Sequence, residues 1–407
     1  MVIALKDVIC YKDHEVSASS KILKGFKSLY NATVTERLLQ EGAIIIGRTN
    51  CDEFAMGASN ENSAFGPVLN AADPSRVPGG SSGGSAVAVQ TGMCHAALGS
   101  DTGGSIRQPA AFTGTVGLKP TYGRISRWGL LAYASSFDQI GPMTLTVADA
   151  ALLLEVMAGP DQHDATCSTQ TVDAYTLALD EAPEKPLRIA YLGDALDHPG
   201  LDTEIRLRSF DLFETLRSQG HTVEAVSFPY LDYMVPCYYV LTTAEASSNL
   251  SRYSGLTYGY RSPAAHDLES TFKRSRSEGF GPEVKRRIML GTFVLSSDYY
   301  DAYYSKAQKV RRVIRDKTAA LLEQYDFLLL PTTSTPPFRL GEKASDPIAM
   351  YLADLFTVQA NLAGNPAISI PAGTNSAGLP FGMQVMAGNF KEAAMLRFSD
   401  YLSRLLP

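Results

Sequence analysis

Two glycine- and serine-rich segments are the parts of this sequence best suited to chemistry. The first is PGGSSGGS at residues 78–85 and the second is GSDTGGSIR at residues 99–107, so Ser105 follows Ser81 by 24 positions. Glycine allows the backbone to approach a ligand closely, and successive N–H groups in such turns can hold an anion. Serine hydroxyls beside free backbone donors are what acyl transfer requires, namely a nucleophile and a site for the oxyanion.

Three other interpretations of these segments compete with catalysis. A flexible linker would be rich in glycine and serine, but the first segment lies between Val77 and the apolar run Ala86–Val89. A phosphate-binding loop would need the spacing GxxxxGK[ST] or GxGxxG, and neither is present. Either segment alone could be a tight structural turn. Two such segments, each offering serine hydroxyls, favour a catalytic role over two unrelated turns.

Lysine is a better candidate than histidine for the base that would activate a serine. Histidine is the usual base, but of the six histidines only His95 lies near either segment, and it belongs to an apolar run where we expect a core residue. Lys6 ends the apolar run Val2–Leu5, where burial would lower the pKa of the amine and allow its neutral form to accept a proton. A strand-end lysine that extends its head group into water is the structural alternative.

The remainder of the chain alternates short apolar runs with segments of helical spacing that end at glycine. This alternation predicts an α/β fold with a central mixed, mostly parallel sheet covered by helices on both faces. The expected strands are residues 1–7, 43–47, 95–99, 187–192, 221–226, 325–330, 367–370 and 381–385. The expected helices are residues 33–42, 85–92, 146–159, 203–220, 282–324 and 391–406.

Composition limits the classes of function. The 407 residues are 45% hydrophobic and 19% charged, as expected of a folded protein. The net charge of −6 gives no support for direct binding to nucleic acid or to an anionic membrane. The five cysteines are scattered without CxxC spacing, which argues against a disulfide framework and a zinc site and favours core positions. We therefore expect a cytoplasmic protein without a bound metal.

Long stretches of the sequence resemble the amidase-signature family, whose catalytic triad is serine, cis-serine and lysine. The family signature is matched by GGSSGGSAVAV at residues 79–89 and by GSDTGGSIRQPAAFTGTVGLKPTYGRIS at residues 99–126. The resemblance extends over nearly the whole chain and implies one large amidase domain, residues 1–407. Family members carry some tens of helical residues before the strand that bears the lysine. We expect that this N-terminal helical segment is missing here, through truncation or a wrongly assigned start.

The resemblance implies roles for particular residues. Ser105 resembles the nucleophile that forms the acyl-enzyme. Ser81 resembles the central serine, held by a cis peptide, that relays protons between Ser105 and Lys6. Three neighbouring residues resemble the backbone of the oxyanion hole: Thr102, Gly103 and Gly104.

Shorter stretches at residues 49–70, 135–144, 283–293 and 351–364 resemble one branch of the family, the A subunit of glutamyl-tRNA(Gln) amidotransferase. In that branch glutamine is the amide donor. Three residues resemble those of its pocket: Asp354 for the α-amino group, Arg287 for the α-carboxylate and Tyr238 in the lining. An amino-acid zwitterion needs one anion and one cation, and arginine can hold a carboxylate with two hydrogen bonds.

The branch resemblance implies a glutaminase subunit that passes ammonia to a partner. The partners would be the B and C subunits of a heterotrimer, and tRNA would be contacted indirectly through the B subunit. This chain would hold no cofactor, since ATP and Mg²⁺ would belong to the partner that activates Glu-tRNA(Gln) or Asp-tRNA(Asn). Two alternatives remain. One is a stand-alone amidase for another carboxamide, which would not need the pair Arg287 and Asp354. The other is a non-catalytic assembly subunit with an idle triad.

Overall fold

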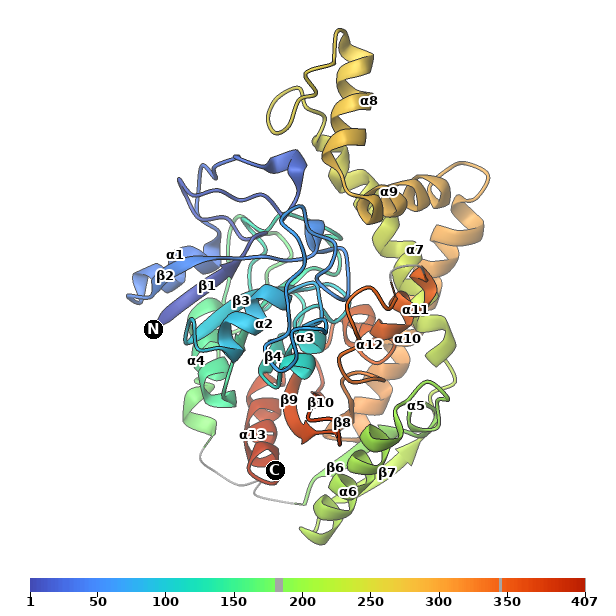
Figure 1. Cartoon of the computed structure of the whole chain (residues 1–407). Helices are drawn as coiled ribbons and strands as arrows, with labels where there is room; N and C mark the ends of the chain where they lie inside the picture. Colours follow the sequence, from blue (N-terminus) through green and yellow to red (C-terminus); the bar gives the residue numbers. More distant parts are fainter. Residues whose placement is uncertain (180–185, 344–345, 407) are drawn as a thin grey trace.

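The computed structural model describes residues 1–179, 186–343 and 346–406. In these residues ten strands form one sheet (Figure 1). The strands are β1 (Val2–Lys6), β2 (Ile44–Thr49), β3 (Ala96–Asp101), β4 (Val116–Lys119), β5 (Gln139–Thr144), β6 (Arg188–Leu192), β7 (Thr222–Val226), β8 (Phe327–Pro331), β9 (Ala367–Thr374) and β10 (Pro380–Met386). Their order across the sheet is β2-β1-β3-β5-β4-β9-β10-β8-β6-β7.

Most of the predicted helices are present, with ends shifted by a few residues. The α-helices are α1 (Thr33–Gln40), α2 (Gly83–Gln90), α3 (Arg107–Thr113), α4 (Val147–Met157), α5 (Gly193–Leu196), α6 (Thr203–Ser218), α7 (Leu231–Asn249), α8 (Leu268–Gly279), α9 (Pro282–Val294), α10 (Lys306–Gln324), α11 (Pro347–Tyr351), α12 (Val358–Ala363) and α13 (Glu392–Ser403). The sequence pattern did not predict α3, α5, α7, α8, α11 or α12, and the expected helical stretch 282–324 is divided into α9 and α10. Helix α7 is buried on several sides, so its apolar residues do not form the single stripe by which a surface helix is recognised.

The sheet is mixed, as predicted, but the expectation that it is mostly parallel is wrong. Of the nine neighbouring strand pairs in the described residues, four are parallel and five are antiparallel. The parallel pairs lie at the two ends, in β2-β1-β3 and in β8-β6-β7. The antiparallel middle arises because β4 and β5 lie between β3 and β9, and because β9 and β10 form a hairpin. The sequences of β4 and β5, VGLK and QIGPMT, are short or interrupted by glycine and proline, so no apolar run marks these two strands.

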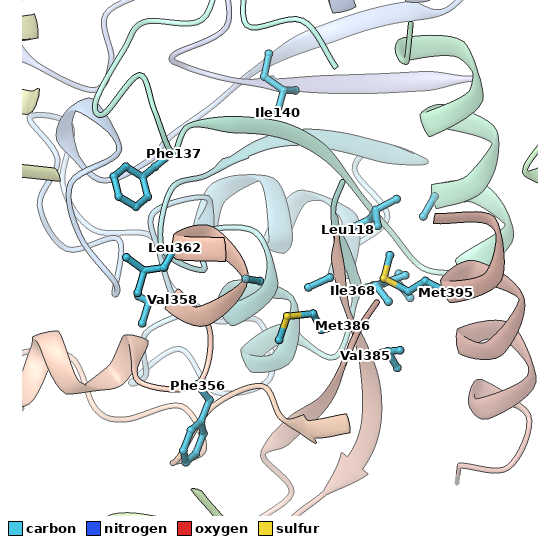
Figure 2. Close-up of a cluster of buried hydrophobic side chains, with 14 of the residues drawn as sticks. Leu118, Phe137, Ile140, Phe356, Val358, Leu362, Ile368, Val385, Met386 and Met395 are labelled. Carbon is cyan, nitrogen blue, oxygen red and sulfur yellow. The ribbon is translucent and has the colours of Figure 1, made fainter. Parts of the chain in front are cut away.

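Helices cover both faces of the sheet, as predicted. Neighbouring residues of a strand point to opposite faces. In β1, Ala4 therefore packs in a small core with α2 and α3, whereas Leu5 packs in a large core that includes α4 and α13. Figure 2 shows part of the large core, where Leu118 of β4 and Ile368 of β9 lie beside Met395 of α13.

Strand β2 is an edge strand rather than a buried one. β2 has a neighbour on one side only, and the side chains of Ile44 and Ile46, which point to the same face of the strand, are 63% and 60% exposed. His95 is also exposed, contrary to the expectation of a core histidine. It stands just before β3, where its Nδ1 accepts a hydrogen bond from the N–H of Val2 at 3.0 Å. Four cysteines are buried, as expected, and Cys167 is half-buried.

None of the helices in the described part of the chain has the length and apolar character needed to cross a bilayer. Residues 1–179, 186–343 and 346–406 also contain no group of three or more His, Cys, Asp or Glu side chains placed to hold a metal ion.

Candidate active site

Lys6 is the last residue of β1, and the alternation of the strand sets the direction of its side chain. Lys6 lies on the same face of the strand as Ala4, which packs against α2 and α3, so Lys6 faces the start of α2. Its side chain is fully buried. Because β1 and β3 are parallel neighbours, they end at the same edge of the sheet. The fold therefore brings Lys6 beside the segment that follows β3.

Three serine hydroxyls surround the amine of Lys6. Its Nζ lies 2.7 Å from the Oγ of Ser81 and 2.9 Å from the Oγ atoms of Ser82 and Ser100. Burial lowers the pKa of Lys6 to about 8, although nearby negative charges such as that of Asp52 act in the opposite direction. A fraction of this lysine is therefore neutral near physiological pH, and a neutral amine can accept the proton of a neighbouring hydroxyl.

Ser81 is joined to Gly80 by a cis peptide bond, as the resemblance led us to expect. Asp52 packs directly against this bond. Its N–H donates to the carbonyl of Ser81 at 3.2 Å, and a Cβ atom on Gly80 would lie only 2.1 Å from its Oδ2, so this position requires glycine. The carboxylate of Asp52 is held in turn by the N–H groups of Asn60 and Asn62, at 2.9 and 3.0 Å.

Ser105 lies next to the same bend. Its carbonyl accepts a hydrogen bond from the N–H of Ser82 at 3.2 Å, which ties the two glycine–serine segments together. Among the described residues the Ser105 hydroxyl has no hydrogen-bond partner, and the residue keeps 8% of its surface exposed. The structure thus gathers Lys6, Ser81 and Ser105 at one edge of the sheet and leaves the Ser105 hydroxyl available to a substrate.

Some of the backbone N–H groups that follow β3 are hydrogen-bonded within the protein, and others are free. The N–H of Gly104 donates to Asp101 Oδ1 at 2.9 Å, so this amide already serves the fold. The N–H groups of Thr102 and Gly103 have no acceptor in the part of the chain that the structure describes. The hydroxyl of Thr102 donates to Asp138 Oδ1 at 2.7 Å and so fixes the turn. The N–H of Ser105 has no acceptor among the described residues either, so three free amides lie in this fixed turn, where they can bind a developing oxyanion.

A fully buried ion pair holds the second glycine–serine segment in place. The Nη2 and Nε atoms of Arg107 lie 3.0 and 3.1 Å from the two carboxylate oxygens of Asp101. Burial alone would raise the pKa of Asp101, but the charge and hydrogen bonds of Arg107 hold that pKa at about 2. The guanidinium also donates to Thr357 O at 2.9 Å and to Asn361 Oδ1 at 2.7 Å. The pair therefore connects the second segment to the region around α12.

Arg287 lies on α9, which packs against α7, and only 3% of its surface is exposed. Its Nε donates to Glu283 Oε1 at 2.8 Å, and its Nη1 donates to Tyr133 Oη at 2.9 Å. Its Nη2 has no partner among the described residues. The Cζ atom is enclosed by three tyrosine rings at 5.2 to 5.6 Å: Tyr133, Tyr239 and Tyr351.

Asp354 ends the short 3₁₀-helix η6 (Leu352–Asp354) and is buried. Burial raises its pKa to about 7, while the hydrogen bond from Tyr239 and the charge of Arg287 act to lower it. The Tyr239 hydroxyl donates to Asp354 Oδ2 at 2.9 Å. No described residue donates to Oδ1. Asp354 and Arg287 thus each keep one polar atom without a partner, one an acceptor and the other a donor.

Two contacts join these residues to the second segment. The ring of Tyr238 lies against Gly103, since a Cβ atom there would lie 2.5 Å from Tyr238 Cζ. Thr357, three residues after Asp354, lies with its Oγ1 2.5 Å from the carbonyl of Gly103. All three predicted pocket residues, Tyr238, Arg287 and Asp354, therefore belong to the network that reaches the turn before Ser105.

Several supporting residues were not identified from the sequence. Glu283 stands four residues before Arg287, a spacing typical of an ion pair on one helix, so this signal was available. Asp101 and Arg107 are opposite charges within a stretch of small residues, which is also a usable signal. Thr357 and Asp138 carry no local signal, because their roles depend on contacts with residues far away in the sequence.

Comparison with known proteins agrees with this arrangement. The sequence model of the family described as "Amidase" matches residues 1–396. The A subunit of glutamyl-tRNA(Gln) amidotransferase from Chlorobium luteolum is 53% identical over 408 residues, which cover 99% of this chain and 83% of the relative. The crystal structure of the corresponding A subunit from Thermotoga maritima superposes with a TM-score of 0.81 at 43% identity, covering 98% of this chain and 81% of that one.

A hydrolase named for a different substrate shares the fold as well. The structure of 6-aminohexanoate cyclic dimer hydrolase gives a TM-score of 0.87 at 25% identity, covering 100% of this chain and 85% of that one. The fold alone therefore does not determine the substrate. In sequence, however, more than half of the aligned residues are identical to those of an amidotransferase A subunit. This chain belongs to the amidase family, in the branch of the glutamyl-tRNA(Gln) amidotransferase A subunits.

Proposed function

We propose that this chain is the glutamine-hydrolysing subunit of a tRNA-dependent amidotransferase, with Ser105 as nucleophile. The observation that carries the proposal is the 2.7 Å contact between Lys6 Nζ and Ser81 Oγ, made beside the tie between Ser82 and Ser105. It supplies a buried amine of lowered pKa, a relay hydroxyl and an unpaired serine hydroxyl in one place. That set meets the requirements of covalent acyl transfer without histidine.

Acylation follows from these positions. Neutral Lys6 accepts the proton of Ser81, and Ser81 accepts the proton of Ser105 as the Ser105 oxygen attacks the side-chain carbonyl carbon of glutamine. The carbonyl oxygen becomes an oxyanion, for which the free N–H groups of Thr102, Gly103 and Ser105 are the donors. The proton held on Lys6 then returns through Ser81 to the leaving nitrogen, which departs as ammonia and leaves a γ-glutamyl ester on Ser105.

Water completes the cycle by the same route. Lys6 and Ser81 accept a proton from the attacking water, the oxyanion forms again, and collapse of the intermediate returns the proton to Ser105 and releases glutamate. The relay is used in both directions, so loss of Lys6 or Ser81 should slow acylation and deacylation together.

Glutamine would be selected by the charges at its α-carbon. The unpaired Nη2 of Arg287 is the proposed donor to the α-carboxylate, and the unpaired Oδ1 of Asp354 is the proposed acceptor from the α-ammonium group. Tyr238 contacts Gly103 and packs edge-on against Tyr239, so it would line the path from the charged end of the substrate to the scissile amide.

The released ammonia would pass to a second subunit. By the branch to which this chain belongs, the proposed partners are B and C subunits in the cytoplasm, with tRNA bound through the B subunit. ATP and Mg²⁺ would act in that subunit, where the acceptor carboxylate is activated, and not at Ser105. Residues 1–407 would form a single amidase domain within the assembly.

The test is hydrolysis of glutamine by the protein purified together with the proteins that associate with it. We expect the wild-type protein to release ammonia from glutamine and to turn over simple carboxamides such as butyramide poorly. In Ser105→Ala, the rate of ammonia release should fall below about 1% of the wild-type rate. Faster turnover of butyramide than of glutamine would favour the stand-alone amidase. No ammonia release from either substrate, together with intact assembly, would favour the non-catalytic subunit.

A further inference from the structure

Tyr239 of α7 connects the two charged residues of the pocket. Its hydroxyl donates to Asp354 Oδ2 at 2.9 Å, and its ring centroid lies 5.2 Å from the Cζ atom of Arg287. The ring also stacks on Tyr351, with centroids 4.0 Å apart and planes inclined by 25°. Only 6% of Tyr239 is exposed, so the packing around the ring fixes the direction of its hydroxyl.

We propose that Tyr239 is a positioning residue that determines specificity for an α-amino amide, by holding Asp354 as an oriented carboxylate. This inference rests on the proposed function, since it concerns the α-ammonium end of the glutamine pocket. Among the described residues, the Tyr239 hydroxyl is the only side-chain donor to the Asp354 carboxylate. That hydrogen bond occupies Oδ2 and leaves Oδ1 as the acceptor for the substrate.

A buried carboxylate without a donor would bind a proton instead of an ammonium group. Burial raises the pKa of Asp354 to about 7, and the hydrogen bond from Tyr239 lowers it from a still higher value. Removal of the hydroxyl therefore raises the pKa further and leaves more Asp354 uncharged at neutral pH. The other charged groups that act on Asp354 stay in place in such a variant: Arg287 from α9, Asp101 and Arg107 from the second segment and α3, and Lys343 before α11.

Tyr239→Phe tests this role, because phenylalanine keeps the ring and removes only the hydroxyl. We expect KM for glutamine to rise about fivefold at neutral pH, because a rise of about one unit from a pKa of about 7 lowers the ionised fraction of Asp354 from about one half to about one tenth. The kcat should stay within about twofold of wild type. The increase in KM should shrink at alkaline pH, where Asp354 is ionised again. Glutaramate, which has the same amide and carboxylate but no α-amino group, should show an unchanged KM.

Two controls separate this role from a structural one. Tyr253→Phe removes another buried tyrosine hydroxyl, on a ring that packs on Phe54 and Phe280, and should leave both KM values unchanged. In an Asp354→Asn background the hydroxyl has no carboxylate to hold, so addition of Tyr239→Phe should not raise KM for glutamine further.

Equal increases in KM for glutamine and glutaramate, or an unchanged KM for glutamine at every pH, would overturn the role of Tyr239 while leaving the proposed function standing. A further increase in KM in the Asp354→Asn background would overturn it as well, and that readout holds even if Tyr239→Phe is less stable. If the wild-type protein hydrolyses no glutamine, both the proposed function and this inference are wrong.

Discussion

The amine of Lys6 and the hydroxyl of Ser81 lie 2.7 Å apart although 75 positions separate them in the sequence. Lys6 reaches this point from the end of a strand, and Ser81 reaches it from the bend before α2. Neither residue is exposed, so bulk water does not compete for the contact. The relation predicts a pH dependence that differs from that of a histidine enzyme.

The turnover number should rise with pH and level off above about pH 8. Burial lowers the pKa of Lys6 to about 8, and only the neutral amine can accept a proton, so kcat falls roughly tenfold per pH unit below that value. Saturating glutamine isolates this effect from the titration of Asp354, which acts on KM. A kcat that is flat from mildly acidic to alkaline pH would contradict the lysine base. Above about pH 8, Lys6→Ala should lower kcat by about 10²–10⁴-fold, and the variant should lose this pH dependence.

Ammonia supplied directly should bypass the Ser105 site. In the assembled amidotransferase, Ser105→Ala should abolish transamidation driven by glutamine while transamidation driven by ammonium chloride stays close to wild type. The Ser105 hydroxyl makes no hydrogen bond to any described residue, so its removal should not disturb the assembly. Equal loss of both activities would show instead that the substitution damages the fold or the contact with the partner.

Substitutions in the pocket should discriminate among substrate analogues. A hydrogen bond to a charged group contributes about 1.5–3 kcal/mol, so its loss weakens binding roughly tenfold to a hundredfold. Asp354→Asn should raise KM for glutamine by that factor but not for glutaramate. Arg287→Ala should raise KM for glutamine but have less effect on 4-aminobutanamide, which lacks the α-carboxylate. If each variant weakens every substrate equally, both residues are structural and the stand-alone amidase becomes the better interpretation.

The buried pair of Arg107 and Asp101 should matter for stability more than any surface pair. Arg107→Met leaves the Asp101 carboxylate buried without its counter-ion, which costs about 3–5 kcal/mol of unfolding free energy. The matched control is Arg188→Met, whose partner Glu224 is half exposed, and it should cost less than about 1 kcal/mol. Urea unfolding of the two variants gives the comparison. Equal losses of stability would show that the Arg107 pair contributes no more than an exposed one.

The sequence predicted every described strand of the sheet except β4 and β5, which are neighbours in its middle. Strand β1 and helix α4 were recognisable because apolar runs and the Thr146 cap mark them, and the Thr146 side chain does accept the N–H of Asp149. Strands β4 and β5 were not, since glycine and proline interrupt their apolar pattern and long-range pairing alone makes them strands. His95 was misplaced for a related reason, because an apolar run does not show where its strand begins.

The site could be predicted only to the extent that short motifs encode it. Ser81 and Ser105 stand in recognisable segments, but the residues that orient them come from elsewhere in the chain. Asp52 holds the Gly80–Ser81 bend from another loop, and Thr357 contacts the carbonyl of Gly103 across 254 positions. No local pattern contains that information, which is a property of the packed chain.

Trapping of the acyl-enzyme by hydroxylamine tests directly whether Ser105 is the nucleophile. If Ser105 carries a γ-glutamyl ester, hydroxylamine competes with water for it and yields γ-glutamyl hydroxamate from glutamine, a product measured by its colour with ferric ion. We expect hydroxamate from the wild-type protein and none above background from Ser105→Ala. Formation of hydroxamate by Ser105→Ala at the wild-type rate would contradict this role of Ser105, because the ester would then lie on another residue.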